Sequence, residues 1–95
     1  MLYNSAQQPK LGILAGNGTM PKEAIEHCKV TNREYFVVGL EPYVMSETLD
    51  STQHYITAQI GEIGKIFNAF RKNEVKEILL AGGIRRPSLS ELIPD

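Results

Sequence analysis

Short runs of apolar residues recur along this 95-residue chain. Three runs are nearly continuous, at residues 11–15 (LGILA), 35–40 (YFVVGL) and 78–81 (ILLA). Continuous runs of this length, without polar alternation, favour strands that are covered on both faces, as in a parallel sheet. A weaker fourth strand is predicted at residues 54–58 (HYITA).

The segments between these runs predict helices. A helix is predicted over residues 62–73, because apolar residues recur three and four positions apart. The members of this stripe are Ile63, Ile66, Phe67 and Phe70. A second helix is predicted over residues 21–31, with Ala24, Ile25 and Cys28 facing inward. Residues 41–53 contain a proline and many small polar residues, so we expect a loop with about one helical turn.

The order of these elements predicts an α/β fold. Parallel neighbouring strands need crossover connections, and those connections are right-handed. We therefore expect a single small domain with a doubly wound parallel sheet of about four strands in the order 3-2-1-4. The order reverses between the first and fourth strands, and ligands of such sheets bind beyond the carboxyl ends of the strands at that reversal.

The loop after the first strand, AGNGTMP, is the first candidate site. Gly16 and Gly18 can adopt positive φ and expose backbone N–H groups, and the following helix N-terminus favours an anion such as phosphate. Pro21 suits the first helical turn and predicts Met20 as the N-cap. A dinucleotide fingerprint would have a third glycine where Pro21 stands, so dinucleotide binding is disfavoured. An ordinary strand-to-helix turn remains the alternative.

The loop after the fourth strand, AGGIRRP, is the second candidate site. Arg85 and Arg86 could bind phosphate, because the guanidinium fork matches phosphate oxygens in pairs. Gly82 and Gly83 keep the backbone open beside them. A solvated arginine pair ahead of Pro87 is the structural alternative. Both loops follow strands at the reversal, so we expect them to face each other across a ligand.

Two further segments have weaker signals. Gly61 and Gly64 bracket the start of the helix predicted over residues 62–73. Lys65 lies in the first turn of this helix, where its charge is unfavourable to the helix dipole unless an anion is bound. An ordinary surface lysine is the alternative interpretation. Ser88 and Glu91 have the spacing of a capping box and predict one more helix.

Charge and composition exclude several classes of function. The chain has 10 basic and 11 acidic residues and a net charge of -1, so no overall field attracts nucleic acid or an anionic membrane. No apolar stretch approaches the roughly 20 residues that span a membrane. Cys28 is the lone cysteine, which favours a reducing compartment. His27 and His54 are isolated, so no metal-binding spacing exists. We assign no catalytic residue in this chain.

Three segments together carry a resemblance to a known family. The segments KLGILAGNGTMP, IGEIGKIFNAFRKNEVKEILLAGGIRRP and LIPD occur in order within residues 10–95. In this combination the chain resembles the N-terminal domain of the UDP-2,3-diacylglucosamine pyrophosphatases of lipid A biosynthesis. The resemblance implies a Rossmann-like N-terminal domain over residues 10–95. We expect residues 1–9, which are mostly polar, to form a disordered tail. It implies that the chain is about a third of such an enzyme and lacks the C-terminal catalytic domain.

The resemblance also implies an activity and a site. The family activity would be hydrolysis of UDP-2,3-diacylglucosamine to UMP and 2,3-diacylglucosamine 1-phosphate, with Mg²⁺ or Mn²⁺ bound by the C-terminal domain. Family members often have a polar side chain where this chain has Gly83. The substrate-binding residues expected in this chain are Gly16, Asn17, Gly18, Met20, Pro21, Gly61, Gly64, Gly82, Gly83, Ile84, Arg85, Arg86 and Pro87.

Three functional hypotheses remain open on the sequence. In the first, the chain is the substrate-binding domain of such a pyrophosphatase and is inactive alone. In the second, it is a stand-alone nucleotide- or phosphosugar-binding module, and in the third it is a degenerate structural remnant. The expected partners are the substrate, the C-terminal domain and, as a further alternative, a second copy of the chain. The expected location is the cytoplasm, with peripheral contact with the inner membrane as an open alternative. We also expect apolar surface to remain exposed, because few helices are available to cover the sheet.

Overall fold

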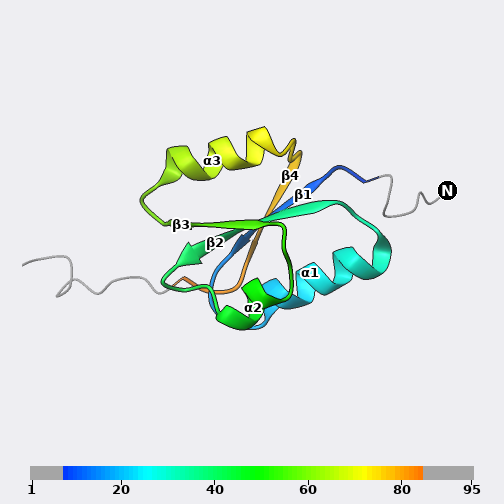
Figure 1. Ribbon diagram of the computed structural model, residues 1–95, viewed down its shortest axis with the longest axis horizontal. Coiled ribbons are helices and arrows are strands. Elements are labelled where there is room, and N and C mark those ends of the chain that lie inside the picture. Colours follow the sequence, from blue (N-terminus) through cyan, green and yellow to red (C-terminus); the bar gives the residue numbers. More distant parts are fainter. Residues whose placement is uncertain (1–7, 85–95) are drawn as a thin grey trace, which may run out of the picture.

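The computed structural model describes residues 8–84, which form a parallel sheet with helices on both faces (Figure 1). The elements in chain order are β1 (Leu11–Ala15), α1 (Met20–Thr31), β2 (Tyr35–Glu41), α2 (Ser46–Asp50), β3 (Tyr55–Gln59), α3 (Ile63–Lys72) and β4 (Glu77–Ala81). Each strand and helix predicted within residues 8–84 is present, with bounds that differ by at most one residue. The loop expected at residues 41–53 contains the short helix α2 as its helical turn.

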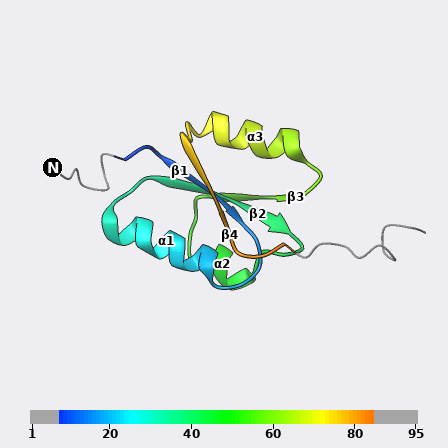
Figure 2. The same cartoon turned by 180° about the vertical axis from the view of Figure 1, so that it is seen from behind.

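The four strands pair in the order β3-β2-β1-β4, and all three pairings are parallel. This order confirms the prediction and places the reversal between β1 and β4. The helices α1 and α2 lie on one face of the sheet and α3 lies on the other, as both views show (Figures 1 and 2). The carboxyl ends of β1 and β4 therefore lie side by side, where the two candidate loops begin.

The core consists of two apolar clusters, one on each face of the sheet. Cys28 and Ile25 of α1 pack against one face, and Ile66 and Phe70 of α3 pack against the other. The fully buried strand residues include Ile13, Val37, Val38 and Leu40. Each face thus gains its hydrophobic stabilisation from one amphipathic helix.

The structure contradicts the expectation that the fourth strand is covered on both faces. Ile78, Leu79 and Leu80 of β4 are 49%, 40% and 57% exposed. In the described part of the chain, β4 is an edge strand, and α3 packs on β2 and β3 instead. Half of the α3 stripe is also uncovered: Ile63 and Phe67 are exposed.

The start of α1 differs from the prediction by one residue. Thr19 is the N-cap and Met20 is already helical, so the expectation that Met20 caps the helix is wrong. Pro21 then occupies the second helical position, where a missing N–H is equally harmless. The Thr19 side chain does not cap the backbone; its Oγ1 hydroxyl donates to Glu23 Oε2 at 3.1 Å. At its other end α1 stops at Asn32, whose left-handed φ of 58° turns the chain toward β2.

Candidate functional site

The loops after β1 and β4 bind each other directly through their backbones. The Asn17 amide donates to the Gly83 carbonyl at 2.7 Å, and the Gly83 amide donates to the Asn17 carbonyl at 3.0 Å. The Gly16 amide also donates to the Ala81 carbonyl at 2.8 Å. This pair of loops, residues 16–18 and 82–83, is called the loop clasp below. It confirms that the two predicted loops meet at the reversal of the strand order.

Glycine is required at two positions of the loop clasp because the backbones approach so closely. A Cβ atom on Gly16 would lie 2.4 Å from the Gly83 carbonyl oxygen. A Cβ atom on Gly82 would lie 2.3 Å from the Asn17 carbonyl oxygen, and Gly82 also has a φ of +88°. Real Cβ contacts do not become this short, so the glycines permit the contact between the loops.

The loop clasp changes the interpretation of the first loop as a phosphate cradle. The amides of Gly16 and Asn17 already donate to carbonyls of the β4 side, so they are not available to an anion. The amides of Gly18 and Thr19 donate to no acceptor within residues 8–84. They lie at the N-terminus of α1, where the helix dipole favours an anion, but the Glu23 carboxylate is already held beside Thr19.

Sequence reasoning missed the role of Glu23. Its position four residues after the N-cap, in the first turn of a predicted helix, was the available signal, because acidic residues are favoured there. An anionic ligand at this helix end would meet both the open amides and this negative charge. The donor groups near Gly18 therefore favour a ligand that presents a neutral or hydroxyl group here, or one whose phosphate lies farther from Glu23.

The third predicted loop does not join the loop clasp. Gly61 and Gly64 are exposed, and a Cβ atom on either would meet no heavy atom within 4 Å. The turn before α3 is held by Glu62, whose Oε1 accepts from the Gln59 amide at 2.7 Å. An open cavity of about 520 Å³ lies between the loops after β2 and β3, and Tyr43 and Gly61 line it. The carboxyl edge of the sheet thus has two separate regions.

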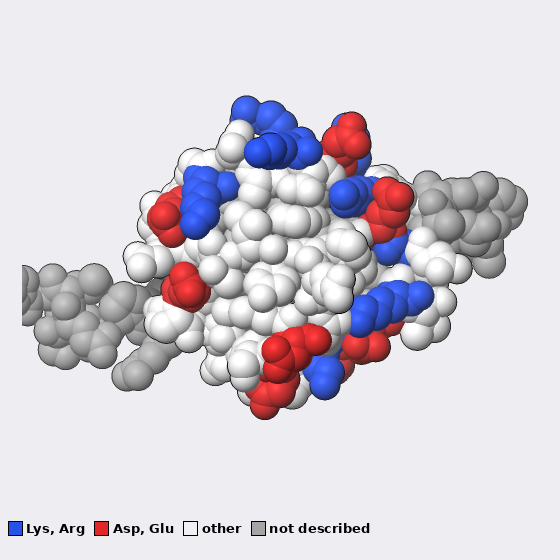
Figure 3. All heavy atoms as spheres, viewed as in Figure 1, with Lys and Arg blue, Asp and Glu red and all other residues white. Residues whose placement is uncertain are grey.

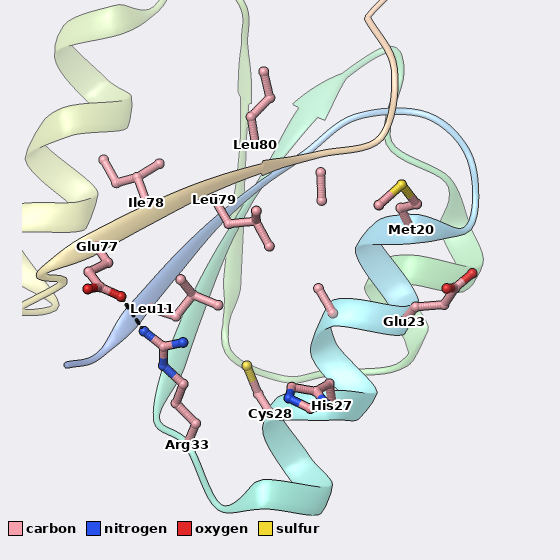
Figure 4. A pocket seen from close by; sticks show the side chains of 12 residues that line it. Leu11, Met20, Glu23, His27, Cys28, Arg33, Glu77, Ile78, Leu79 and Leu80 are labelled. Carbon is pink, nitrogen blue, oxygen red and sulfur yellow. Dashed lines mark hydrogen bonds and ion pairs between the residues drawn. The ribbon is translucent and has the colours of Figure 1, made fainter. Parts of the chain in front are cut away.

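A second and larger cavity opens between α1 and β4 (Figure 4). Its volume is about 890 Å³, and its lining includes Met20, His27 and Cys28 of α1. Leu79 points into this cavity toward α1, whereas its neighbours on β4 point to the other side of the strand (Figure 4). Burial raises the pKa of the Cys28 thiol, and the nearby Arg33 charge partly opposes this effect. The wall of this cavity therefore combines apolar side chains with a thiol whose raised pKa favours its protonated form, and charged side chains also line it.

An ion pair closes one end of the same cavity. Arg33 Nη2 donates to Glu77 Oε1 at 2.6 Å, and Arg33 Nε donates to the Pro9 carbonyl at 3.0 Å. The Arg33 side chain is only 15% exposed, whereas that of Glu77 is 57% exposed. Arg33 thereby ties the amino ends of β1 and β4 together, at the opposite end of the sheet from the loop clasp.

Comparison with known protein families decides where this fold belongs. Residues 10–95 match the family of the LpxI N-terminal domain. The chain belongs to this family. It is also similar to UDP-2,3-diacylglucosamine pyrophosphatase LpxI of Caulobacter vibrioides, with 39% identity over 88 residues. The match covers 90% of this chain and 30% of the relative, so the chain spans less than a third of that protein's length.

The LpxI N-terminal domain in this chain brings together only some of the residues expected to bind substrate. Gly16, Asn17, Gly82 and Gly83 meet in the loop clasp, and Gly18, Met20 and Pro21 lie beside it at the start of α1. Gly61 and Gly64 belong to the separate region before α3, and Ile84 lines an apolar cavity beside that helix. Arg85, Arg86 and Pro87, and the predicted capping box at Ser88 and Glu91, lie outside the described residues.

On one face of this domain, the charged side chains lie mainly around the rim. On the face in Figure 3, Lys and Arg alternate with Asp and Glu around the rim, and the centre carries uncharged residues. Among residues 8–84, no group of three or more His, Cys, Asp and Glu side chains could hold a metal ion. Within the same residues, no helix is long and apolar enough to cross a membrane.

Proposed function

We propose that this chain is the substrate-binding N-terminal domain of a UDP-2,3-diacylglucosamine pyrophosphatase. The complete enzyme would hydrolyse UDP-2,3-diacylglucosamine to UMP and 2,3-diacylglucosamine 1-phosphate in lipid A biosynthesis. The observation that carries the proposal is the family match over residues 10–95, together with the pyrophosphatase activity named for the relative and the 30% of its length that this chain spans. The chain would act in the cytoplasm, with peripheral contact with the inner membrane as the alternative.

The loop clasp supports a specific role for this domain. It fixes the loops after β1 and β4 at the reversal of the strand order, where ligands of such sheets bind. Gly16 and Gly82 act through shape, because they permit the close approach of the two backbones, and the amides of Gly16 and Gly83 are used within the clasp. The groups left to contact substrate are the exposed side chains of Asn17 and Met20 and the amides of Gly18 and Thr19.

The metal chemistry of the proposed enzyme belongs to another part of the protein. Phosphoanhydride hydrolysis commonly uses a divalent metal to stabilise charge and activate water. The described residues provide no cluster that fits Mg²⁺ or Mn²⁺, so no catalytic step is assigned to them. In this proposal the metal and the reacting water are held by the C-terminal domain, and the present domain binds and orients the substrate.

The proposal is tested with a chimera. Residues 10–95 of this chain would replace the matching segment of the Caulobacter vibrioides relative, and UMP release from UDP-2,3-diacylglucosamine would be measured with Mg²⁺ or Mn²⁺. We expect turnover by the chimera and none by the 95-residue chain alone. In the chimera, Asn17→Ala and Met20→Ala should each raise KM, whereas the control Val30→Ala should not, because Val30 is an 80% exposed residue of α1.

Two outcomes would contradict the proposal. Turnover that purifies with the 95-residue chain would show that the catalytic groups lie in this chain. A folded but inactive chimera would show that this domain does not supply the relative's substrate-binding surface. Calorimetry of the chain with UMP and with a UDP-sugar separates the remaining alternatives, since a stand-alone binding module binds one of them and a structural remnant binds neither.

A further inference from the structure

A cavity at the carboxyl ends of β2 and β3 is separate from the loop clasp. Its volume is about 520 Å³, within the range of about 300–1,000 Å³ that is usual for sites of small molecules. This cavity is called the β2–β3 cavity below. Because all strands are parallel, it lies at the same edge of the sheet as the loop clasp (Figure 1). The residues that line it are Glu41, Pro42, Tyr43, Gln59, Ile60 and Gly61.

Two polar side chains lie side by side in the lining of the β2–β3 cavity. Glu41 and Gln59 are the last residues of β2 and β3, and they are partners in the register of the two strands. Register partners in a parallel pair project their side chains from the same face of the sheet, about 5 Å apart. The Gln59 backbone is fixed by Glu62, since the Gln59 amide donates to Glu62 Oε1 at 2.7 Å. Within residues 8–84, neither the Glu41 nor the Gln59 side chain forms a hydrogen bond, so both are available to a ligand.

The charge of the β2–β3 cavity determines which part of a ligand it can take. Glu41 carries the one carboxylate among the six lining residues, and they include no lysine, arginine or histidine. A phosphate would be repelled by this carboxylate and would meet no cation in the lining. Hydroxyl groups suit the cavity better, because an ionised carboxylate accepts short, charge-assisted hydrogen bonds from them.

The other lining residues suit a flat heterocyclic ring. Pro42, Tyr43 and Ile60 provide apolar surface, and aromatic side chains of this kind stack on nucleobases. The loop that carries Tyr43 is held in place, because the Tyr43 amide donates to the Leu40 carbonyl at 2.8 Å. The Gln59 amide group contains a donor and an acceptor, as does the edge of uracil, where N3–H lies beside a carbonyl oxygen.

We propose that the β2–β3 cavity binds the uridine of the substrate, with Glu41 accepting hydrogen bonds from the two ribose hydroxyls and Gln59 pairing with the edge of uracil. The inference rests on the proposed function, which supplies a uridine nucleotide as substrate. Adjacent strands lie about 4.8 Å apart, so the middle of the β2–β3 pair lies roughly 10 Å from the middle of the β1–β4 pair. The diphosphate of an extended UDP group would therefore reach from the cavity toward the open amides of Gly18 and Thr19.

Matched changes in the protein and in the ligand test each contact. NMR titrations of the 95-residue chain would give the Kd for UMP, 2′,3′-dideoxy-UMP and 3-methyl-UMP. Glu41→Gln should weaken UMP binding about tenfold, because a hydrogen bond to a charged group is lost. Removal of the ribose hydroxyls should weaken it similarly in the unmodified chain but not in Glu41→Gln, since the same bonds are already absent. Gln59→Leu and 3-methyl-UMP should show the same dependence on each other.

Two exposed residues outside the β2–β3 cavity provide matched controls. Glu47→Gln removes a carboxylate from α2, and Gln53→Leu removes an amide group before β3. Neither substitution should change the Kd for UMP. The backbone amide signals of Glu41, Tyr43 and Gln59 should shift as UMP is added. No shift of these signals at millimolar UMP would overturn the proposal, as would analogues that bind less tightly by the same factor in the unmodified chain and in the variants.

Hydrolysis by the chimera separates this proposal from the proposed function. We expect Glu41→Gln and Gln59→Leu to raise the KM of the chimera for UDP-2,3-diacylglucosamine about tenfold each. An active chimera whose KM neither substitution changes would overturn the uridine site and leave the proposed function intact. A folded but inactive chimera would contradict the proposed function, whereas the UMP titrations of the 95-residue chain would still decide whether the β2–β3 cavity binds uridine.

Discussion

Replacing Gly82 by alanine tests whether the loop clasp holds the carboxyl edge of the sheet together. Gly82 has a φ of +88°, a conformation that costs an alanine about 1–2 kcal/mol. The new Cβ would also lie 2.3 Å from the Asn17 carbonyl oxygen, which is backbone and cannot rotate away. Overpacking of this kind costs roughly 1–3 kcal/mol more. We therefore expect Gly82→Ala to lower the free energy of unfolding by about 3 kcal/mol.

Urea unfolding monitored by circular dichroism measures this loss, and two other glycines provide graded controls. Gly18 has a φ of +93° but open space around it, so Gly18→Ala should cost only the backbone term of about 1–2 kcal/mol. Gly64 lies in α3 with open space, so Gly64→Ala should stabilise the protein by about 0.5–1 kcal/mol. At roughly 4–8 °C per kcal/mol for a domain of this size, Gly82→Ala should lower Tm by more than 10 °C.

The order of the three effects is the decisive result. If Gly82→Ala costs no more than Gly18→Ala, the contact between the loops contributes nothing beyond local backbone strain, and the loop clasp is not a structural requirement. Gly16→Ala repeats the test from the other loop, since its Cβ would lie 2.4 Å from the Gly83 carbonyl oxygen without a positive φ. A stable Gly16→Ala variant would refute the same reasoning.

Two further predictions concern buried polar groups. Because burial raises the pKa of the Cys28 thiol, the folded protein retains this proton at pH values where the unfolded chain releases it. The contribution of this proton to stability is complete below the thiol pKa of the unfolded chain, about 8.5, and is lost as pH rises through the pKa of the folded protein. Cys28→Ala should therefore flatten the fall of the unfolding free energy between about pH 8 and 10. An unchanged dependence of the unfolding free energy on pH would contradict this prediction. Tyr35→Phe should cost about 1 kcal/mol in urea unfolding, because the Tyr35 hydroxyl lies 2.7 Å from Thr52 Oγ1. Tyr55→Phe is the exposed control, and equal effects would refute the role of this hydrogen bond.

The fold could be predicted because apolar runs and helical spacing mark elements that bury side chains. Residues 11–15 are a continuous apolar run, and β1 has these bounds in the structure. The sheet order followed from the crossover connections, which allow few arrangements. Exposed apolar surface was expected from the small number of helices, but its location on β4 could not be predicted, because an apolar run does not show which neighbouring segment packs on it.

The nature of the candidate site was harder to predict for a different physical reason. A Gly-x-Gly loop after a strand is compatible with a ligand cradle or with a close approach of two backbones, because both need the absence of a Cβ atom. Only the position of the loop after β4 distinguishes them, and that position depends on residues more than 60 positions away in the chain. The meeting of the loops was predicted from topology, whereas the use of the Gly16 and Asn17 amides within the loop clasp was visible only in the structure.

The loop clasp and the exposed apolar residues of β4 are connected through a single strand. Gly83 binds Asn17 immediately after β4 ends, and β4 pairs with β1 along its whole length. A shift of β4 by one residue would therefore break the loop clasp and would turn Leu79 and Leu80 to the opposite faces of the sheet. In the proposed enzyme, the shape of the substrate-binding edge would then depend on the register in which β4 pairs with β1.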